Sequence, residues 1–138
     1  EDIRANAVSQ YASQVSAIPA VRTFLLDMQR QLARTHSVVM DGRDIGTVVL
    51  PQADVKIFLT ASDQERARRR QKELAEKGET VPLKDVLDQI RQRDHADQNR
   101  AVSPLKKAAD AVELNTSCLD LAESEEALYR IVKERLPL

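Results

Sequence analysis

The segment Asp41-Gly42-Arg43-Asp44 brings two carboxylates, a guanidinium and a glycine together directly after a short apolar run. That run, 37–40, is rich in β-branched residues and predicts a buried strand. The glycine permits a sharp turn. In open parallel α/β sheets, ligands bind just beyond the carboxyl ends of strands. The charged turn is therefore a candidate binding site, and the alternative is a solvated turn whose arginine pairs with a neighbouring carboxylate.

A second charged group lies at the end of a helix predicted over 83–99. Helical spacing gives that helix one inward apolar face, made of Leu83, Val86 and Ile90. The same face continues with three charged residues, Arg93, Asp97 and Arg100. Because buried charges must be paired or ligand-bound, we expect the helix to start in the core and to end in a polar cleft. The alternative is a surface ion pair between Arg93 and Asp97.

A third group is a run of basic residues on a helix that begins near Ser62 and ends at Gly78. Five basic residues fall within seven positions, namely Arg66, Arg68, Arg69, Arg70 and Lys72. The forked guanidinium suits phosphate oxygens, so the run predicts phosphate contacts. The alternative is a solvated helix face paired with nearby glutamates. Ser62 and Glu65 have the spacing of a capping box.

Further candidates lie on the helices that precede the charged turn. A helix over 1–17 places Ser13 close to an apolar stripe, and a second helix runs from Pro19 to about Arg34 with Arg22 beside its stripe. Either side chain could contact a ligand. The alternatives are an ordinary helical serine and a surface arginine.

The remaining elements predict the fold class. Strands are expected over 54–60 and 110–115 and a last helix over 124–136, with connections long enough for parallel crossovers. The chain reads as one α/β domain. Its sheet of three short strands would normally have neighbours and its first residue is Glu1, so we expect an N-terminal piece to be missing.

Composition excludes several classes of function. The 21 Lys+Arg nearly balance the 22 Asp+Glu, which argues against a general nucleic-acid binder. No segment has the length and apolarity of a membrane span. The single cysteine, Cys118, fits a reducing, cytoplasmic compartment. His36 and His95 lack metal-ligand spacing, so no metal site is expected in this chain.

Several separate motifs resemble bacterial cytidylate kinase. They are Asp41-Gly42-Arg43-Asp44-Ile45-Gly46-Thr47-Val48-Val49, the segments 55–59 and 65–70, Arg93-Asp94-His95-Ala96-Asp97-Gln98-Asn99-Arg100, and the segments 103–105 and 108–111. Their order and spacing match those of this family over essentially the whole chain. The resemblance implies a three-layer, P-loop nucleoside-monophosphate-kinase-like α/β fold with a parallel sheet. Within one domain fragment over 1–138 it implies acceptor-binding helices (1–35), core strands with the charged turn (37–61), a lid (62–82) and C-terminal core helices with a strand (83–138).

The implied activity is transfer of the γ-phosphoryl group of ATP, with Mg²⁺, to CMP or dCMP by a cytoplasmic monomer that needs no nucleic acid or membrane. The residues matching the pyrimidine site are Ser13, Arg22 and Asp44. Those near the sugar are Asp97 and Arg93, and those near the acceptor phosphate are Arg43 and Arg100. The lid arginines facing the ATP phosphates are Arg66, Arg69 and Arg70. A direct catalytic role is implied for Arg43, Arg69, Arg70 and Arg100.

The chain departs from the family in one respect. It contains no G-x-x-x-x-G-K-[ST] phosphate loop, whose strand is central in the family's sheet. The expectation is therefore that this chain alone does not transfer phosphate. One alternative is a non-catalytic fragment that retains only the CMP pocket. Another, a structural interaction module, leaves the Arg93, Asp97 and Arg100 face unexplained.

Overall fold

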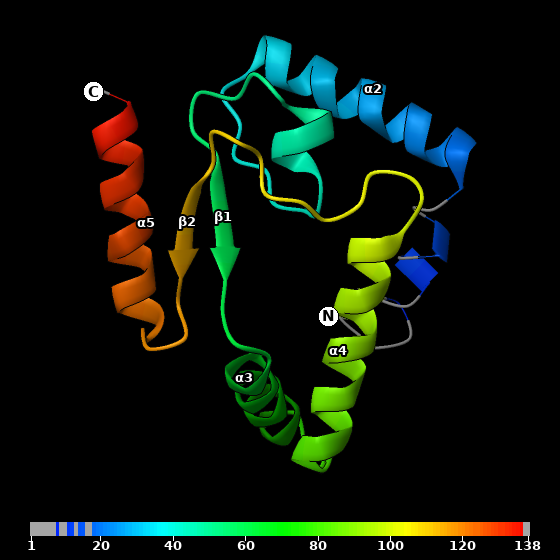
Figure 1. Ribbon diagram of the computed structural model, residues 1–138, viewed down its shortest axis with the longest axis vertical. Coiled ribbons are helices and arrows are strands. Elements are labelled where there is room, and N and C mark those ends of the chain that lie inside the picture. The colour runs from blue at the N-terminus through cyan, green and yellow to red at the C-terminus, as the bar shows by residue number, and fades with distance from the viewer. Residues whose placement is uncertain (1–7, 9–10, 13, 16–17, 137–138) are drawn as a thin grey trace.

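The computed structural model describes residues 8, 11–12, 14–15 and 18–136. Along the chain its elements are α2 (Pro19–Thr35), the π-helix η2 (Ile45–Val49), β1 (Ile57–Thr60), α3 (Asp63–Glu76), α4 (Leu83–Asn99), β2 (Val112–Asn115) and α5 (Leu121–Arg135) (Figure 1). Most of the helix predicted over 1–17 lies outside the described residues. None of the described helices is both long and apolar enough to cross a membrane.

The two strands confirm the predicted parallel α/β class. β1 and β2 pair in parallel, with Ile57 opposite Val112 and Thr60 opposite Asn115. One further backbone bond, 2.8 Å from the Thr116 N–H to the Thr60 carbonyl, extends the pairing past the strand ends. α5 runs alongside β2 and packs against it (Figure 1).

The prediction of a buried strand over 37–40 is wrong. These residues have no regular secondary structure, and Val39 is fully exposed. A strand exists only where a neighbour satisfies its backbone N–H and C=O groups. Among the described residues the sheet consists of β1 and β2 alone, and neither pairs with 37–40. The expected three-stranded sheet is therefore two-stranded here.

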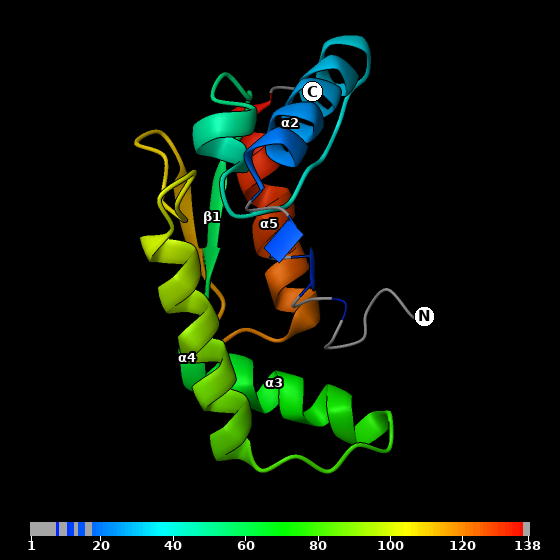
Figure 2. The same cartoon turned by 90° about the vertical axis from the view of Figure 1, so that its right-hand side faces the viewer.

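Helices α3 and α4 form a hairpin below the sheet, with α3 running across α4 (Figure 2). Its buried core consists of Ala67, Leu74 and Val86, against which Val81, Leu87 and Ile90 pack. The inward placement predicted for Leu83 is wrong, because this first helical residue is 39% exposed and Leu87 packs instead. Ion pairs join the helices as well, at 2.6 Å each, between Asp63 and Arg91 and between Arg66 and Asp94.

Local signals placed most helix ends where the sequence predicted them, but α5 begins at Leu121 rather than at 124, because Asp120 and Glu123 form a capping box there. Pro19 occupies the first turn of α2, and the Ser62 hydroxyl accepts a 3.2 Å bond from the Glu65 N–H at the start of α3. Gly78, with φ of 83°, follows the end of α3 in a conformation that favours glycine. By contrast, the apolar stripe of α2 remains largely exposed, as Phe24 at 68% shows.

Candidate binding site

A pocket of about 220 Å³ lies where α2, the charged turn and the chain after α4 meet. Its lining residues are Arg22, Leu25, Leu26, Gln29, Asp41, Gly42, Arg43, Asp44, Ile45, Val49 and Arg100. In Figure 1 the loop that follows α4 passes close to the segment that leads into η2. The pocket thus joins three parts of the chain that are far apart in sequence, and it contains the charged turn chosen on sequence grounds.

Asp44 lies at the centre of the first charge cluster and is buried, with an exposed fraction of 8%. Its Oδ2 accepts a hydrogen bond from Arg22 Nη2, and its Oδ1 lies 3.6 Å from Arg100 Nη2. The carboxylate is therefore held between guanidinium groups from α2 and from the residue that ends α4. This contradicts the alternative in which Arg22 is an ordinary surface residue.

Asp97 forms the second cluster and is also buried, at 6% exposed. Arg43 Nε donates a 2.7 Å hydrogen bond to its Oδ2, whereas Arg93 Nε lies 4.0 Å away on a side chain that is 56% exposed. The inward direction predicted for Asp97 is thus confirmed, whereas Arg93, predicted on the same face, is exposed and is not among the residues that line the pocket. The i,i+4 pair exists, but the dominant partner of Asp97 comes from the turn.

The electrostatic character of the pocket follows from these contacts. Arginine side chains outnumber the nearby carboxylates even when Asp41, which lines the pocket, is included. The Nη2 of Arg100 is buried and has no hydrogen-bond partner within the described part of the chain. A buried donor without a hydrogen-bond acceptor is unusual, and an oxygen of a bound ligand would satisfy it. The site is suited to a polar ligand that carries an anion.

The π-helix η2 positions Asp44. The Asp44 carbonyl accepts bonds of 2.9 Å from the Val48 N–H and 3.2 Å from the Val49 N–H. Arg30 of α2 donates to the carbonyls of Val48 at 2.7 Å and Val49 at 3.1 Å, which satisfies acceptors at the end of η2. Arg30 was not among the predicted site residues, because nothing local marks an arginine that reaches 18 or 19 positions along the chain.

The feature that favours glycine at position 42 is close packing rather than backbone conformation. A Cβ at this position would lie 3.0 Å from Ile45 Cγ1, and Gly42 does not have a positive φ. The expected sharp, glycine-dependent turn is therefore a close approach to η2.

Ser103 is a second residue of this site that was not predicted from the sequence. Its hydroxyl accepts a 3.1 Å bond from Arg22 Nε, and its carbonyl accepts from Arg100 Nε. Its φ of 50° lies in the left-handed region. The segment 103–105 was one of the motifs that carry the family resemblance, but no role in the site was assigned to Ser103.

The arginines of α3 do not reach this pocket. Arg66 binds both carboxylate oxygens of Asp94, at 3.0 and 2.6 Å. Arg69 donates to the carbonyls of Thr116 at 2.6 Å and Leu119 at 3.1 Å. Arg70 contacts Glu73 at 2.7 Å. These side chains have protein partners in this conformation, so their predicted phosphate contacts stay a prediction.

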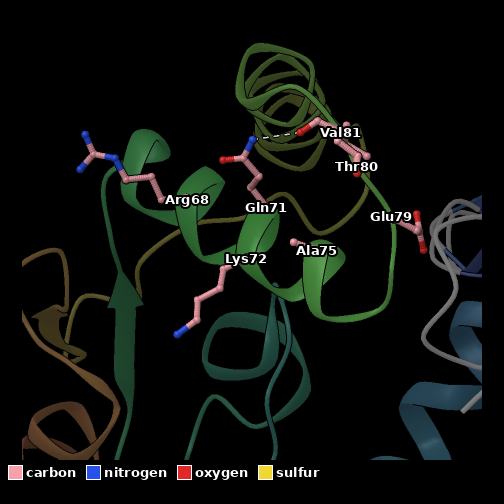
Figure 3. A pocket seen from close by; sticks show the side chains of 7 residues that line it. All are labelled: Arg68, Gln71, Lys72, Ala75, Glu79, Thr80 and Val81. Atoms are coloured by element: carbon pink, nitrogen blue, oxygen red, sulfur yellow. Dashed lines mark hydrogen bonds between the residues drawn. The ribbon is translucent and has the colours of Figure 1, made fainter.

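A separate pocket of about 250 Å³ lies between α3 and the 79–81 connection. There Gln71 donates a 2.9 Å bond to the Val81 carbonyl (Figure 3). Figure 3 shows the side chains of Arg68 and Lys72 pointing away from that bond. Without charged groups that converge on one point, this pocket is the weaker candidate.

The carboxyl groups with lowered pKa values lie outside the first pocket, and two of them, Asp63 and Glu73, belong to α3. The Arg91 guanidinium lowers the pKa of Asp63, and Lys77 with Arg70 lowers the pKa of Glu73 to about 2. Lys56 similarly lowers the pKa of Asp110. Among the described residues, no three His, Cys, Asp or Glu side chains are grouped as metal ligands would be. Ser13, predicted to contact the ligand, lies outside the described residues.

Comparison with known proteins gives a consistent result. A family model described as "Cytidylate kinase" matches residues 1–134. Curated relatives named cytidylate kinase include those of Fervidobacterium nodosum (50% identical over 98% of this chain and 62% of the relative) and Magnetococcus marinus (51%, over 97% and 60%). That of Thermosipho melanesiensis is 47% identical over 99% of this chain and 63% of the relative. The chain thus spans about three fifths of the length of these relatives.

Proposed function

Because this chain belongs to the cytidylate kinase family, we propose that its charged pocket binds the acceptor nucleotide, CMP or dCMP, of an ATP-dependent phosphotransferase. One observation carries the proposal. Two buried carboxylates, Asp44 and Asp97, are each held by arginines from other elements around one polar pocket. Burying charged groups costs desolvation free energy, so a buried cluster of this kind is typical of a binding site. It also combines the hydrogen-bond acceptors and donors that a nucleoside monophosphate requires.

The base and sugar contacts follow from the chemistry of the nucleotide. Cytosine presents an exocyclic amine donor beside ring acceptors, so its binding site needs a carboxylate next to a donor. Asp44 and Arg22 form such a pair at the pocket wall. We assign Ser13 to the same group. Asp97 and the exposed Arg93, which lies 4.0 Å from it, are assigned to the ribose hydroxyls, for which a carboxylate is an acceptor.

The acceptor phosphate is assigned to Arg43 and Arg100. Arg43 uses its Nε for Asp97, and a guanidinium carries five N–H donors, so further donors remain for a phosphate. The buried Nη2 of Arg100 lacks a hydrogen-bond partner among the described residues, and a ligand oxygen would supply one. Arginine forks and phosphate oxygens form strong, charge-assisted hydrogen bonds.

In the proposed reaction an oxygen of the CMP phosphate attacks the γ-phosphorus of ATP, and ADP leaves. The protein contributes positioning and charge stabilisation rather than covalent chemistry. Arg66, Arg69 and Arg70 of α3 are proposed to neutralise the transferring phosphoryl group, which requires release of partners such as Asp94 and Thr116. Mg²⁺ would supply further neutralisation of the ATP phosphates. The described residues do not fit a metal site, and the ion is not assigned to any of them.

Activity, the ATP site, the monomeric state and the cytoplasmic location are proposals for the whole protein. The chain itself contains no G-x-x-x-x-G-K-[ST] motif, so a second candidate function is nucleotide binding without transfer by these residues alone. The two candidates share the acceptor pocket and differ in turnover.

Isothermal titration of the folded protein with CMP, dCMP and UMP tests the pocket. We expect CMP and dCMP to bind more tightly than UMP. The exocyclic amine of cytosine can donate a hydrogen bond to Asp44, whereas UMP has a carbonyl at that position. Equal affinities for CMP and UMP, or no binding of either, would contradict the proposal. A coupled assay for ADP release in the presence of ATP then separates the kinase from the binding-only candidate.

A further inference from the structure

We propose that Ser103 is a positioning residue that orients Arg22 and Arg100 together, and so sets the geometry of the pocket for its nucleotide. The inference rests on the proposed function for the identity of the ligand, but it is carried by contacts that none of the family motifs predicted. Ser103 lies in the connection between α4 and β2, outside both carboxylate clusters.

The two oxygen atoms of Ser103 accept from two different arginines. Its Oγ accepts a 3.1 Å bond from Arg22 Nε, across 81 positions of sequence, and its carbonyl accepts from Arg100 Nε. Both guanidinium groups direct an Nη2 atom towards Asp44. Ser103 therefore binds the Nε of both cations, while Asp44 accepts a hydrogen bond from Arg22 Nη2 and lies at ion-pair distance from Arg100 Nη2.

This arrangement decides the orientation of the guanidinium planes. A planar fork that is bonded through one nitrogen alone can still rotate, whereas bonds through Nε and Nη2 fix its plane. Arg22 has both kinds of bond, to Ser103 and to Asp44, and its side chain is 18% exposed. The acceptor that orients Arg22 Nε is thus a neutral hydroxyl. A carboxylate in the same place would add negative charge to a site proposed to bind an anion.

The backbone of Ser103 supports a role beyond chain connection. Its φ of 50° is uncommon for a residue with a Cβ, and a residue before proline is further biased towards extended conformations. Such strain persists only where the surroundings impose it, and it is concentrated at functional sites. Two residues after Ser103, the Leu105 N–H donates a 2.7 Å bond to the Asp97 carbonyl, which attaches this loop to the end of α4.

The test compares Ser103→Gly and Ser103→Ala in the protein as its gene encodes it, with Ser37→Gly, an exposed serine outside the pocket lining, as the matched control. Both Ser103 variants remove the hydroxyl, but glycine accepts the left-handed backbone and alanine does not. We expect the Kd for CMP to rise about 5-fold in Ser103→Gly and at least as much in Ser103→Ala, because a hydrogen bond to a charged donor is lost. In ¹⁵N NMR the Arg22 Nε–H signal should shift in both variants, and that of Arg100 more strongly in Ser103→Ala.

Coupling to Arg22 separates positioning from a merely structural role. In an Arg22→Met background, Ser103→Gly should change the Kd by less than about twofold, because the hydroxyl then has no guanidinium to orient. An equal loss of affinity in both backgrounds would overturn the inference. So would wild-type affinity and an unmoved Arg22 signal in Ser103→Gly. A wild-type protein that binds no CMP would overturn the proposed function instead, while the Arg22 signal would still report whether Ser103 holds that side chain.

Discussion

Arg43 Nε lies 2.7 Å from Asp97 Oδ2, although the two residues are 54 positions apart. This bond joins the charged turn before η2 to the last turn of α4. The pair is asymmetric, because the Asp97 side chain is only 9% exposed whereas the Arg43 side chain is 42% exposed. The buried carboxylate of Asp97 thus orients Arg43, which lines the pocket and keeps part of its guanidinium exposed.

Asp97→Asn should lower the free energy of unfolding by about 1–2 kcal/mol, because the charge-assisted bond to Arg43 is lost at a buried position. CMP affinity should fall at the same time, by about tenfold, since Arg43 loses its orientation. Urea denaturation and calorimetric titration measure the two effects. Arg93→Met is the matched comparison, and it should cost less than about 1 kcal/mol, because that side chain is exposed and 4.0 Å from Asp97.

Asp44→Asn should weaken binding of CMP and dCMP by at least about tenfold, because the buried carboxylate is the proposed acceptor for the cytosine amine. The discrimination between CMP and UMP should shrink in the same variant. Titration with both nucleotides gives the ratio directly. If the ratio is unchanged while both affinities fall, Asp44 only holds Arg22 and Arg100 in position and does not contact the base.

Arg30→Met should destabilise the protein by about 1–3 kcal/mol, because the Val48 and Val49 carbonyls lose a charged donor at the end of η2. Arg34→Met, at an exposed position in the last turn of the same helix, is the control and should be nearly neutral. Hydrogen exchange of the Val48 and Val49 amides should accelerate in Arg30→Met alone. Equal protection in both variants would show that η2 does not depend on Arg30.

Val86→Ala should cost about 2 kcal/mol, because Val86 is 2% exposed in the small core of the α3–α4 hairpin. Leu83→Ala removes a larger side chain from the same helix, yet it should cost less, because Leu83 is 39% exposed. Thermal unfolding of the two variants gives the order. The reverse order would restore the inward face with Leu83 that the helical spacing predicted.

Glu73 should titrate near pH 2 in a ¹³C NMR titration of its carboxyl group, because Lys77 and Arg70 lower its pKa to about 2. A lowered folded-state pKa contributes stability above the ordinary value of 4.5, and this contribution is lost as the pH falls through 2. Lys77→Gln should raise the Glu73 pKa, as should high salt, because the group is exposed. A value near 4.5 in the wild-type protein would contradict the contact.

Much of the secondary structure could be predicted because its determinants are local. The bounds of α4 agree with the predicted 83–99, and those of α2 and α3 agree to within about two residues. Apolar spacing, Pro19, Ser62 and Gly78 act within a few residues of the element that they define. The strand over 37–40 failed for the opposite reason, because a strand depends on a neighbour that no local pattern supplies.

The sequence by itself determined the family, the α/β class, the helices and the list of charged residues, since motifs and helix ends are properties of contiguous segments. Only the tertiary structure decided which charged residues form ion pairs with each other. It paired Arg43 with Asp97 and Arg22 with Asp44, tied the α3 arginines to protein partners, and placed Ser103 between Arg22 and Arg100. These contacts span tens of positions, and they form only when the turn, the end of α4 and α2 pack around one pocket.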